Sequence, residues 1–174
     1  MKPITKWNLE QIKDKNDPKF IKLRKDIVIN TTKFVKKWHD NQEYLSNPKL
    51  LREALDDYEK WHEHYTMGGS ESYFTDLHLA LDQNNSDLKA KENKVSDLAR
   101  NIANQMIFFS MRISKVDKKI QQKFLNAPEL KKYTHHLEQL FLEAKYLLSE
   151  PEEKILNLTS KTGYADWVHM LISF

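Results

Sequence analysis

Histidines and carboxylates are the residues of this sequence whose types and spacing could do chemistry, because both are common ligands of zinc and iron. His62 and His64 stand two apart in the segment Trp61-His62-Glu63-His64. On a helix, side chains two apart point to roughly opposite sides, whereas a helical zinc site needs histidines four apart. No two of the seven histidines have that spacing. The sequence therefore predicts no metal ligand and no catalytic residue, and solvated or half-buried imidazoles are the expected state.

Two other arrangements of histidine deserve the same test. His135 and His136 are adjacent, so on one helix they diverge by about 100° and do not bind one ion together. Glu59-x-x-His62 has the spacing used by di-iron carboxylate bundles, which combine two such pairs with two further glutamates. The nearest second copy is Asp166-x-x-His169, which has the shorter acid. A di-iron site is thus an alternative, for which the sequence supplies one of the two Glu-x-x-His pairs.

Other kinds of active site lack their residues in this chain. There is no cysteine, which excludes disulfides, thiolate metal sites and cysteine nucleophiles and fits a reducing cytoplasm. No serine stands in a Gly-x-Ser-x-Gly setting. Gly163 lies in no phosphate-binding loop. We therefore expect a cytoplasmic protein segment without a catalytic, cofactor-binding or metal-binding site of its own.

Basic residues are concentrated near the start of the chain, where a phosphate backbone could bind. The cluster comprises Lys19, Lys22, Arg24, Lys25, Lys33, Lys36 and Lys37. The next helix carries acids at Glu53, Asp56, Asp57 and Glu59, and no base-reading motif accompanies the positive charge. A solvated helix face is the preferred interpretation, so no nucleic-acid partner is predicted. No membrane partner is predicted either, since the longest uncharged apolar stretch, 101–111, is too short to span a bilayer.

The elements that must position these residues are helices. Hydrophobic residues make up 40% of the 174 residues and charged residues 30%, with only 3 Gly and 5 Pro, a composition that favours helix over sheet. Apolar residues recur at helical spacing in eight segments. These segments lie near residues 18–38, 48–65, 74–81, 88–116, 120–124, 130–147, 155–158 and 167–174. The predicted fold is all-α, a bundle of about seven to eight antiparallel helices in a single domain, 1–174.

Several local signals set the predicted boundaries. Asp17, Asn47, Asp117 and a loop ending at Ser86 supply helix caps, and Ser149 with Glu152 forms a capping box. Paired glycines at 68–69 should interrupt the second helix, and Gly163 should end the one that begins at the capping box.

Aromatic and aliphatic stripes indicate which helix faces should be buried. Leu88, Val95, Ile102, Phe109 and Val116 fall seven apart, with Ala99, Met106 and Ile113 on the neighbouring line, a pattern typical of a helix in a bundle. Trp38, Trp61 and Trp167 are expected in the core. Trp167, Met170, Leu171 and Phe174 start a stripe that runs to the end of the sequence. In the absence of a partner that covers it, we expect that face to be exposed and prone to weak self-association.

Three segments resemble one enzyme family. Trp7-Asn8-Leu9 is similar to a Trp-Asp/Asn-Leu opening, and 105–109 is similar to a paired aromatic on a long helix. The third segment runs from Tyr133 to Trp167 and is the most specific. It contains Tyr133, Leu137-Glu138, Leu148-Ser149-Glu150, Glu153-Lys154, Thr162-Gly163 and Trp167. In order and spacing these residues resemble the N-terminal helical part of the oligoendopeptidase F branch of thimet-type zinc metallopeptidases. The sequence departs from the family at Gly68-Gly69, where a more regular helix is typical.

The resemblance implies a role in a larger enzyme that hydrolyses short peptides. In that family, zinc is held by His-Glu-x-x-His and a later glutamate, and none of these residues has a counterpart here. The expected partners are therefore a C-terminal catalytic part that carries the zinc, and the peptide substrates of the parent enzyme. This chain would be the N-terminal lobe, shaping the substrate channel and inactive alone. The alternative is a free-standing helical module that binds another protein without enzyme activity.

Overall fold

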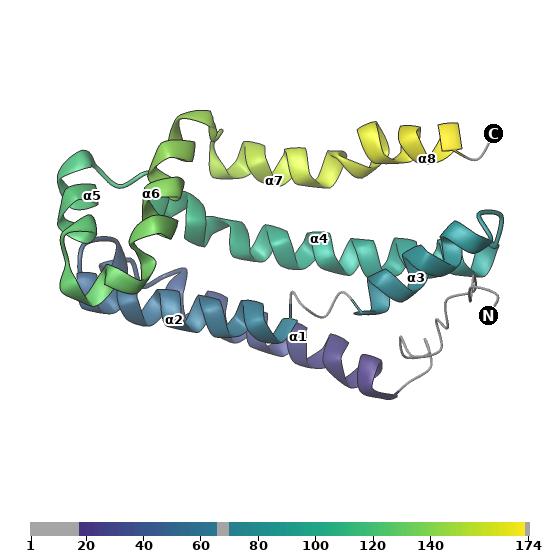
Figure 1. The fold of residues 1–174 in the computed structure, drawn as a ribbon, viewed down its shortest axis with the longest axis horizontal. Helices are drawn as coiled ribbons and strands as arrows, with labels where there is room; N and C mark the ends of the chain where they lie inside the picture. The colour runs from purple at the N-terminus through teal and green to yellow at the C-terminus, as the bar shows by residue number, and fades with distance from the viewer. Residues whose placement is uncertain (1–17, 66–69, 173–174) are drawn as a thin grey trace, which may run out of the picture.

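The computed structural model describes residues 18–65 and 70–172, and within those ranges the regular structure is helical, without strands. Figure 1 shows the α-helices in chain order. They are α1 (Pro18–Trp38), α2 (Pro48–Tyr65), α3 (Ser70–Leu81), α4 (Ser86–Ser114), α5 (Lys118–Leu125), α6 (Thr134–Glu143), α7 (Glu150–Thr159) and α8 (Asp166–Ile172). Short 3-10 turns lie at Glu43–Leu45, Pro128–Tyr133 and Ala144–Tyr146. The predicted all-α class is confirmed.

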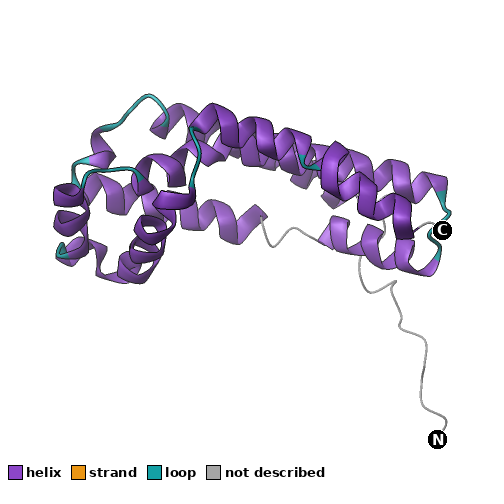
Figure 2. Ribbon diagram, turned by 90° about the horizontal axis from the view of Figure 1, so that it is seen from above, coloured by secondary structure: helices purple, strands orange, loops and turns teal. Residues whose placement is uncertain are grey.

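Helix α4 is the central element of an elongated bundle. It packs against α1 and α3 on one side and against α7 on the other. Figure 1 shows the short helices α5 and α6 together at one end of the bundle. In the same view α1 and α2 run antiparallel to each other below α4, and α7 runs antiparallel to α4 above it. Figure 2 shows the elongated shape of the bundle from above. Only residues 39–47 join α1 to α2, and a short connection favours antiparallel neighbours.

Three of the predicted caps begin helices as expected, whereas the cap of α4 is Asn85, one residue before the predicted Ser86. The Asn47 side-chain oxygen accepts the Lys49 N–H at 3.0 Å at the start of α2. The Asp117 carboxylate accepts the Ile120 N–H at 2.9 Å before α5. At the start of α7, the Glu152 carboxylate accepts the Ser149 N–H at 2.8 Å, so the predicted capping box is present. These bonds satisfy donors that a helix start would otherwise leave unpaired. The predicted cap Asp17 lies outside the described residues.

A dense core fills the end of the bundle that carries α5 and α6. We call it the aromatic core, and it includes Phe34, Trp38, Tyr44, Leu51, Leu55, Phe108, Phe109, Ile113, Phe124, Leu130, Tyr133 and Leu137. Phe109 lies at its centre. Its ring centroid is 4.9 Å from that of Tyr58, 5.2 Å from that of Phe34 and 5.5 Å from that of Tyr44. Such aromatic pairs stabilise a core beyond the area that they bury.

Two predicted helix boundaries were wrong. The expected helix over 130–147 is three pieces, because Pro128–Tyr133 and Ala144–Tyr146 are 3-10 turns around α6. In a 3-10 turn, residues three apart lie on one side, and this brings both Leu130 and Tyr133 into the core. Gly163 does not end α7, which stops at Thr159. It lies in a π-helical turn, Lys161–Ala165, that continues into α8, and its φ is not positive, so it adopts no left-handed helix-ending conformation.

Two burial predictions were also wrong. Trp167 is 59% exposed, because α8 extends along one side of the bundle with one face uncovered by the described residues. Ala99 is exposed rather than part of the buried stripe of α4, although Ile102, Met106 and Phe109 are buried as expected. Gly68-Gly69 lies outside the described residues; α2 ends at Tyr65 and α3 begins at Ser70.

Candidate functional site

Most described histidines have structural partners. The His39 backbone oxygen accepts the Arg112 guanidinium at 2.6 Å, and the His39 ring also lies 3.0 Å from it. The rings of His64 and His78 bond to backbone oxygens one turn earlier. Burial lowers the pKa of His62, and nearby His136 lowers it further. Among the side chains described, no group of three or more His, Asp or Glu residues is arranged to hold a metal ion.

Glu59, the acid of the di-iron alternative, belongs to a different network. Its carboxylate lies 2.8 Å from the Tyr133 hydroxyl oxygen and also accepts a hydrogen bond from the ammonium of Lys132. The same hydroxyl lies 2.6 Å from the Asp56 carboxylate, and Arg52 pairs with Asp56 at 2.9 Å. Burial raises the pKa of Tyr133, and both carboxylates raise it further. This network fastens the 3-10 turn Pro128–Tyr133 to α2. The side chains of Asp166 and His169, the other half of the alternative, lie outside what the structure describes.

Basic residues of α1 pair with acids on neighbouring helices. The Lys37 ammonium lies 2.7 Å from Glu53 and 2.8 Å from Asp57. These hydrogen bonds, to Asp57 first and then to Glu53, raise the pKa of Lys37. Arg24 pairs with Glu71 of α3 at 3.0 Å. At these positions the basic cluster therefore serves contacts between helices rather than only a solvated face.

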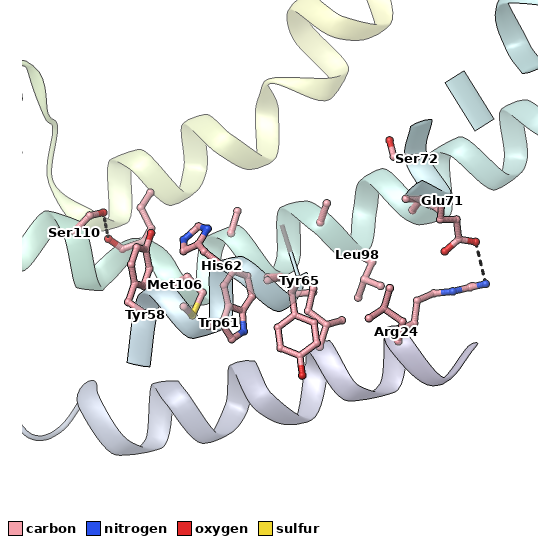
Figure 3. Close-up of a pocket in the computed structure, with 17 residues that line it drawn as sticks. Arg24, Tyr58, Trp61, His62, Tyr65, Glu71, Ser72, Leu98, Met106 and Ser110 are labelled. Atoms are coloured by element: carbon pink, nitrogen blue, oxygen red, sulfur yellow. Dashed lines mark hydrogen bonds and ion pairs between the residues drawn. The ribbon is translucent and has the colours of Figure 1, made fainter. Parts of the chain in front are cut away.

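A cavity of about 430 Å³ opens between α1, α2, α3 and α4 (Figure 3). We call it the α1–α4 cavity. Apolar side chains form most of its wall. They are Leu23, Ile27, Tyr58, Trp61, Tyr65, Val95, Leu98, Ala99, Ile102, Ala103, Met106 and Ile107. Its polar lining residues are Arg24, His62, Glu71, Ser72 and Ser110. Its volume and lining are those of a small-molecule site.

A charge cluster around one buried carboxylate stands at one end of this cavity. The Glu71 side chain is only 7% exposed and pairs with both Arg24, at 3.0 Å, and Lys91 of α4, at 3.3 Å. The Lys91 ammonium also lies 5.4 Å from the ring of Phe74. Figure 3 shows Arg24 and Glu71 at one end of the cavity, with Tyr58 and Ser110 at the other. Sequence reasoning missed this site; the only hint was the small residue Ala99 on the stripe of α4.

Exposed apolar side chains gather in the last third of the described chain. We call this surface the C-terminal apolar face. It comprises Leu142, Tyr146, Leu148, Ile155, Leu156, Leu158, Tyr164, Trp167, Met170 and Leu171. Each is at least 42% exposed. Trp167, Met170 and Leu171 of the C-terminal stripe are exposed in this chain, together with further apolar residues of α6 and α7. Phe174 lies outside the described residues. Contiguous exposed apolar surface usually marks an interaction site.

Polar contacts hold the helix beneath this face to α4. The Asn157 side-chain amide donates to that of Asn104 at 2.6 Å. Glu150 lies 3.6 Å from Arg112, and the Lys115 ammonium donates to the Leu148 backbone oxygen. Helix α7 is thus fixed in position while its apolar side chains remain in solvent. None of the helices described has the length and apolarity that crossing a bilayer requires.

Comparisons with known proteins support the family resemblance of the segment from Tyr133 to Trp167. Residues 112–170 match the family described as Oligopeptidase F. An oligoendopeptidase F homolog from Borreliella burgdorferi is 32% identical over 151 residues, which is 87% of this chain and 24% of the relative. The chain contains the N-terminal region of an oligoendopeptidase F-type protein. No solved structure matches significantly.

The oligoendopeptidase F match covers particular features of the fold. Residues 112–170 include Tyr133, whose hydroxyl joins the network on α2, and the capping box at Ser149. They also include α7 and most of the C-terminal apolar face. The α1–α4 cavity lies mainly before the matched residues, since its lining ends at Ser110. This oligoendopeptidase F-type region spans about a quarter of the length of the curated relative that it matches.

Proposed function

We propose that this chain is the N-terminal lobe of an oligoendopeptidase F-like zinc metalloendopeptidase, and that it shapes the channel through which short peptides reach the metal. The family match supports the parent activity. The observation that carries the role of the lobe is the C-terminal apolar face, which lies within the matched residues and is left in solvent.

The chemistry of the parent would depend on residues outside this chain. Zinc would polarise the peptide carbonyl and activate a water molecule when bound to a His-Glu-x-x-His helix. This sequence has no such motif, and its described side chains offer no cluster of three ligands. What these residues contribute is a helical wall, fastened internally by the Tyr133 network and presenting apolar surface to the rest of the enzyme. Such a wall selects substrates by size and positions them, without cleaving a bond.

The first test is the reading frame of the native gene. We expect it to continue beyond Phe174 and to encode His-Glu-x-x-His a few hundred residues later. An in-frame stop codon directly after Phe174 would favour a free-standing helical module, because the C-terminal apolar face would then serve a separate partner protein.

The second test compares one substitution in two contexts. Leu158→Lys places a charge on the C-terminal apolar face, where Leu158 is 52% exposed. In the 174-residue chain the free energy of unfolding should change by no more than about 0.5 kcal/mol. In the full-length parent the same change should lower the unfolding temperature and the rate of peptide cleavage, since the charge would be buried against the catalytic part. Lys36→Gln on α1 is the control. Equal behaviour of Leu158→Lys in both contexts would contradict the docking role.

A further inference from the structure

The α1–α4 cavity combines an apolar wall with a charge cluster around the buried carboxylate of Glu71 at one end. We propose that this cavity binds a small amphipathic carboxylate, a molecule with a hydrocarbon body and a single carboxylate head. The proposal does not depend on the proposed function, because every residue that carries it belongs to this chain.

The wall indicates the body of the ligand. Along α4 it is formed by Leu98, Ile102, Ala103 and Met106, and across from them by Trp61 and other apolar residues of α1 and α2. A peptide in this place would bury backbone amides against side chains that offer them few partners, at a cost for each unpaired group. A hydrocarbon has no such groups. The wall therefore favours a hydrocarbon over a peptide.

The charge cluster indicates the head of the ligand. Two cations, Arg24 and Lys91, share the single carboxylate of Glu71, which leaves one positive charge in excess. The Arg24 Nε and Lys91 Nζ atoms are buried, and neither makes a hydrogen bond within the described part of the chain. Buried donors usually have an acceptor. Arg24 lines the cavity, whereas Lys91 stands behind Glu71 and is not a lining residue. A ligand carboxylate would supply an acceptor to Arg24 and would balance the charge, and the planar guanidinium of Arg24 suits carboxylate geometry.

The position of the cluster fixes the orientation of the ligand. Arg24 and Glu71 stand at one end of the cavity in Figure 3, and Met106, Tyr58 and Ser110 lie toward the other. The carboxylate would therefore lie beside Arg24, with the hydrocarbon extending along α4 past Leu98 toward Met106.

Calorimetric titration of the 174-residue chain with three probes of equal chain length tests this assignment. The probes are sodium decanoate, decan-1-ol and decylammonium chloride, each below its critical micelle concentration. We expect decanoate to bind at one equivalent and about tenfold more tightly than decan-1-ol, because only decanoate forms charge-assisted hydrogen bonds with Arg24. Decylammonium should bind most weakly. A short apolar peptide, trileucine, carries a carboxylate on a peptide body and should bind more weakly than decanoate.

Two variants locate the binding. Arg24→Gln should weaken decanoate binding by about tenfold and leave decan-1-ol binding unchanged, since only the head contact is lost. Lys25→Gln is the matched control, because Lys25 is the adjacent exposed cation on α1 and does not line the cavity. Ala103→Trp fills the mouth of the cavity from an exposed position, so it should abolish binding of both probes while circular dichroism confirms that the helices remain.

Four results would overturn the proposal. Decan-1-ol binding as tightly as decanoate would remove the role of the charge cluster. Unchanged decanoate binding in folded Ala103→Trp would place the probe elsewhere. Tighter binding of trileucine than of decanoate would show that the cavity is a peptide subsite. Absence of decanoate binding altogether would equally contradict the proposal, and none of these results bears on whether the parent is a peptidase.

Discussion

The aromatic core and the α1–α4 cavity are built by the same long helices, yet one is filled and the other is open. Near its C-terminal end, α4 presents Phe108 and Phe109, both 1% exposed, to α1 and α2. About two turns earlier the same helix presents Ala99 and Ala103. Helices held apart by large side chains at one end leave space at the other, where the side chains are small. Side-chain size along α4 thus separates a region that stabilises the fold from a region available for a ligand.

The largest expected difference between the two regions is the cost of removing a side chain. Phe109→Ala should lower the free energy of unfolding by about 3–5 kcal/mol, since the surrounding rings cannot close the space that it leaves. Leu98→Ala at the cavity should cost less than about 2 kcal/mol, because Leu98 is only partly buried and already borders open volume. Urea unfolding followed by circular dichroism measures both. Equal losses would show that the cavity is packed in solution.

The Tyr133 network should have the next largest effect. Tyr133→Phe keeps the ring in the aromatic core and removes the hydroxyl that donates to Asp56 at 2.6 Å, so unfolding free energy should fall by about 1–2 kcal/mol. Tyr146→Phe is the matched control, since Tyr146 is 75% exposed, and it should change stability by less than about 0.5 kcal/mol. A neutral result for Tyr133→Phe would mean that the network adds nothing to the attachment of the 3-10 turn.

His62, which lines the α1–α4 cavity, should make a smaller contribution to the free energy of unfolding, and this contribution should depend on pH. Burial, with a further contribution from His136, lowers the pKa of His62 below its unfolded value, which is about 6.5. The unfolded chain therefore binds more protons, so stability is full above about pH 6.5 and decreases as the pH falls toward the folded value. His62→Gln should flatten the difference in unfolding free energy between about pH 7.5 and about pH 5.5. His135→Gln, at an 85% exposed side chain, should not; identical slopes for both variants would contradict the assignment.

The smallest effect on stability is expected at the C-terminal apolar face. Trp167→Lys should change unfolding free energy by no more than about 0.5 kcal/mol, because Trp167 is 59% exposed. The same variant should reduce concentration-dependent self-association of the isolated chain, measured by sedimentation velocity. Lys36→Gln serves again as the surface control. Self-association that persists in Trp167→Lys would place the contact on another surface.

The helices and their starts were predictable from the sequence because their signals are local. Asn47, Asp117 and the Ser149 capping box each act within one turn, and the stripe of α4 is set by periodicity alone. The Pro128–Tyr133 turn was not predicted as a 3-10 turn, since its conformation depends on Leu130 and Tyr133 reaching a core contributed by α1, α2 and α4. The predicted burial of Trp167 was wrong because an apolar stripe does not reveal whether another part of the protein covers it.

The α1–α4 cavity was beyond sequence reasoning because it depends on how four helices meet. No periodicity shows that Arg24, Glu71 and Lys91, on three different helices, come together. The resemblance to a family did not show it either, since the residues that carry the most specific likeness begin at Tyr133. Only the alanines of α4 hinted at missing volume, and an alanine on a helix stripe is equally compatible with close packing.

The π-helical turn between α7 and α8 has a geometric consequence for whatever the C-terminal apolar face contacts. Each residue of an α-helix turns the direction of the next side chain by about 100°, so the number of residues in Lys161–Ala165 sets the angular phase of α8 relative to α7. Removing one of them would swing Trp167 and Met170 around the helix axis while leaving α7 unchanged. The length of this turn therefore determines the direction in which the exposed side chains of α8 project relative to those of α7.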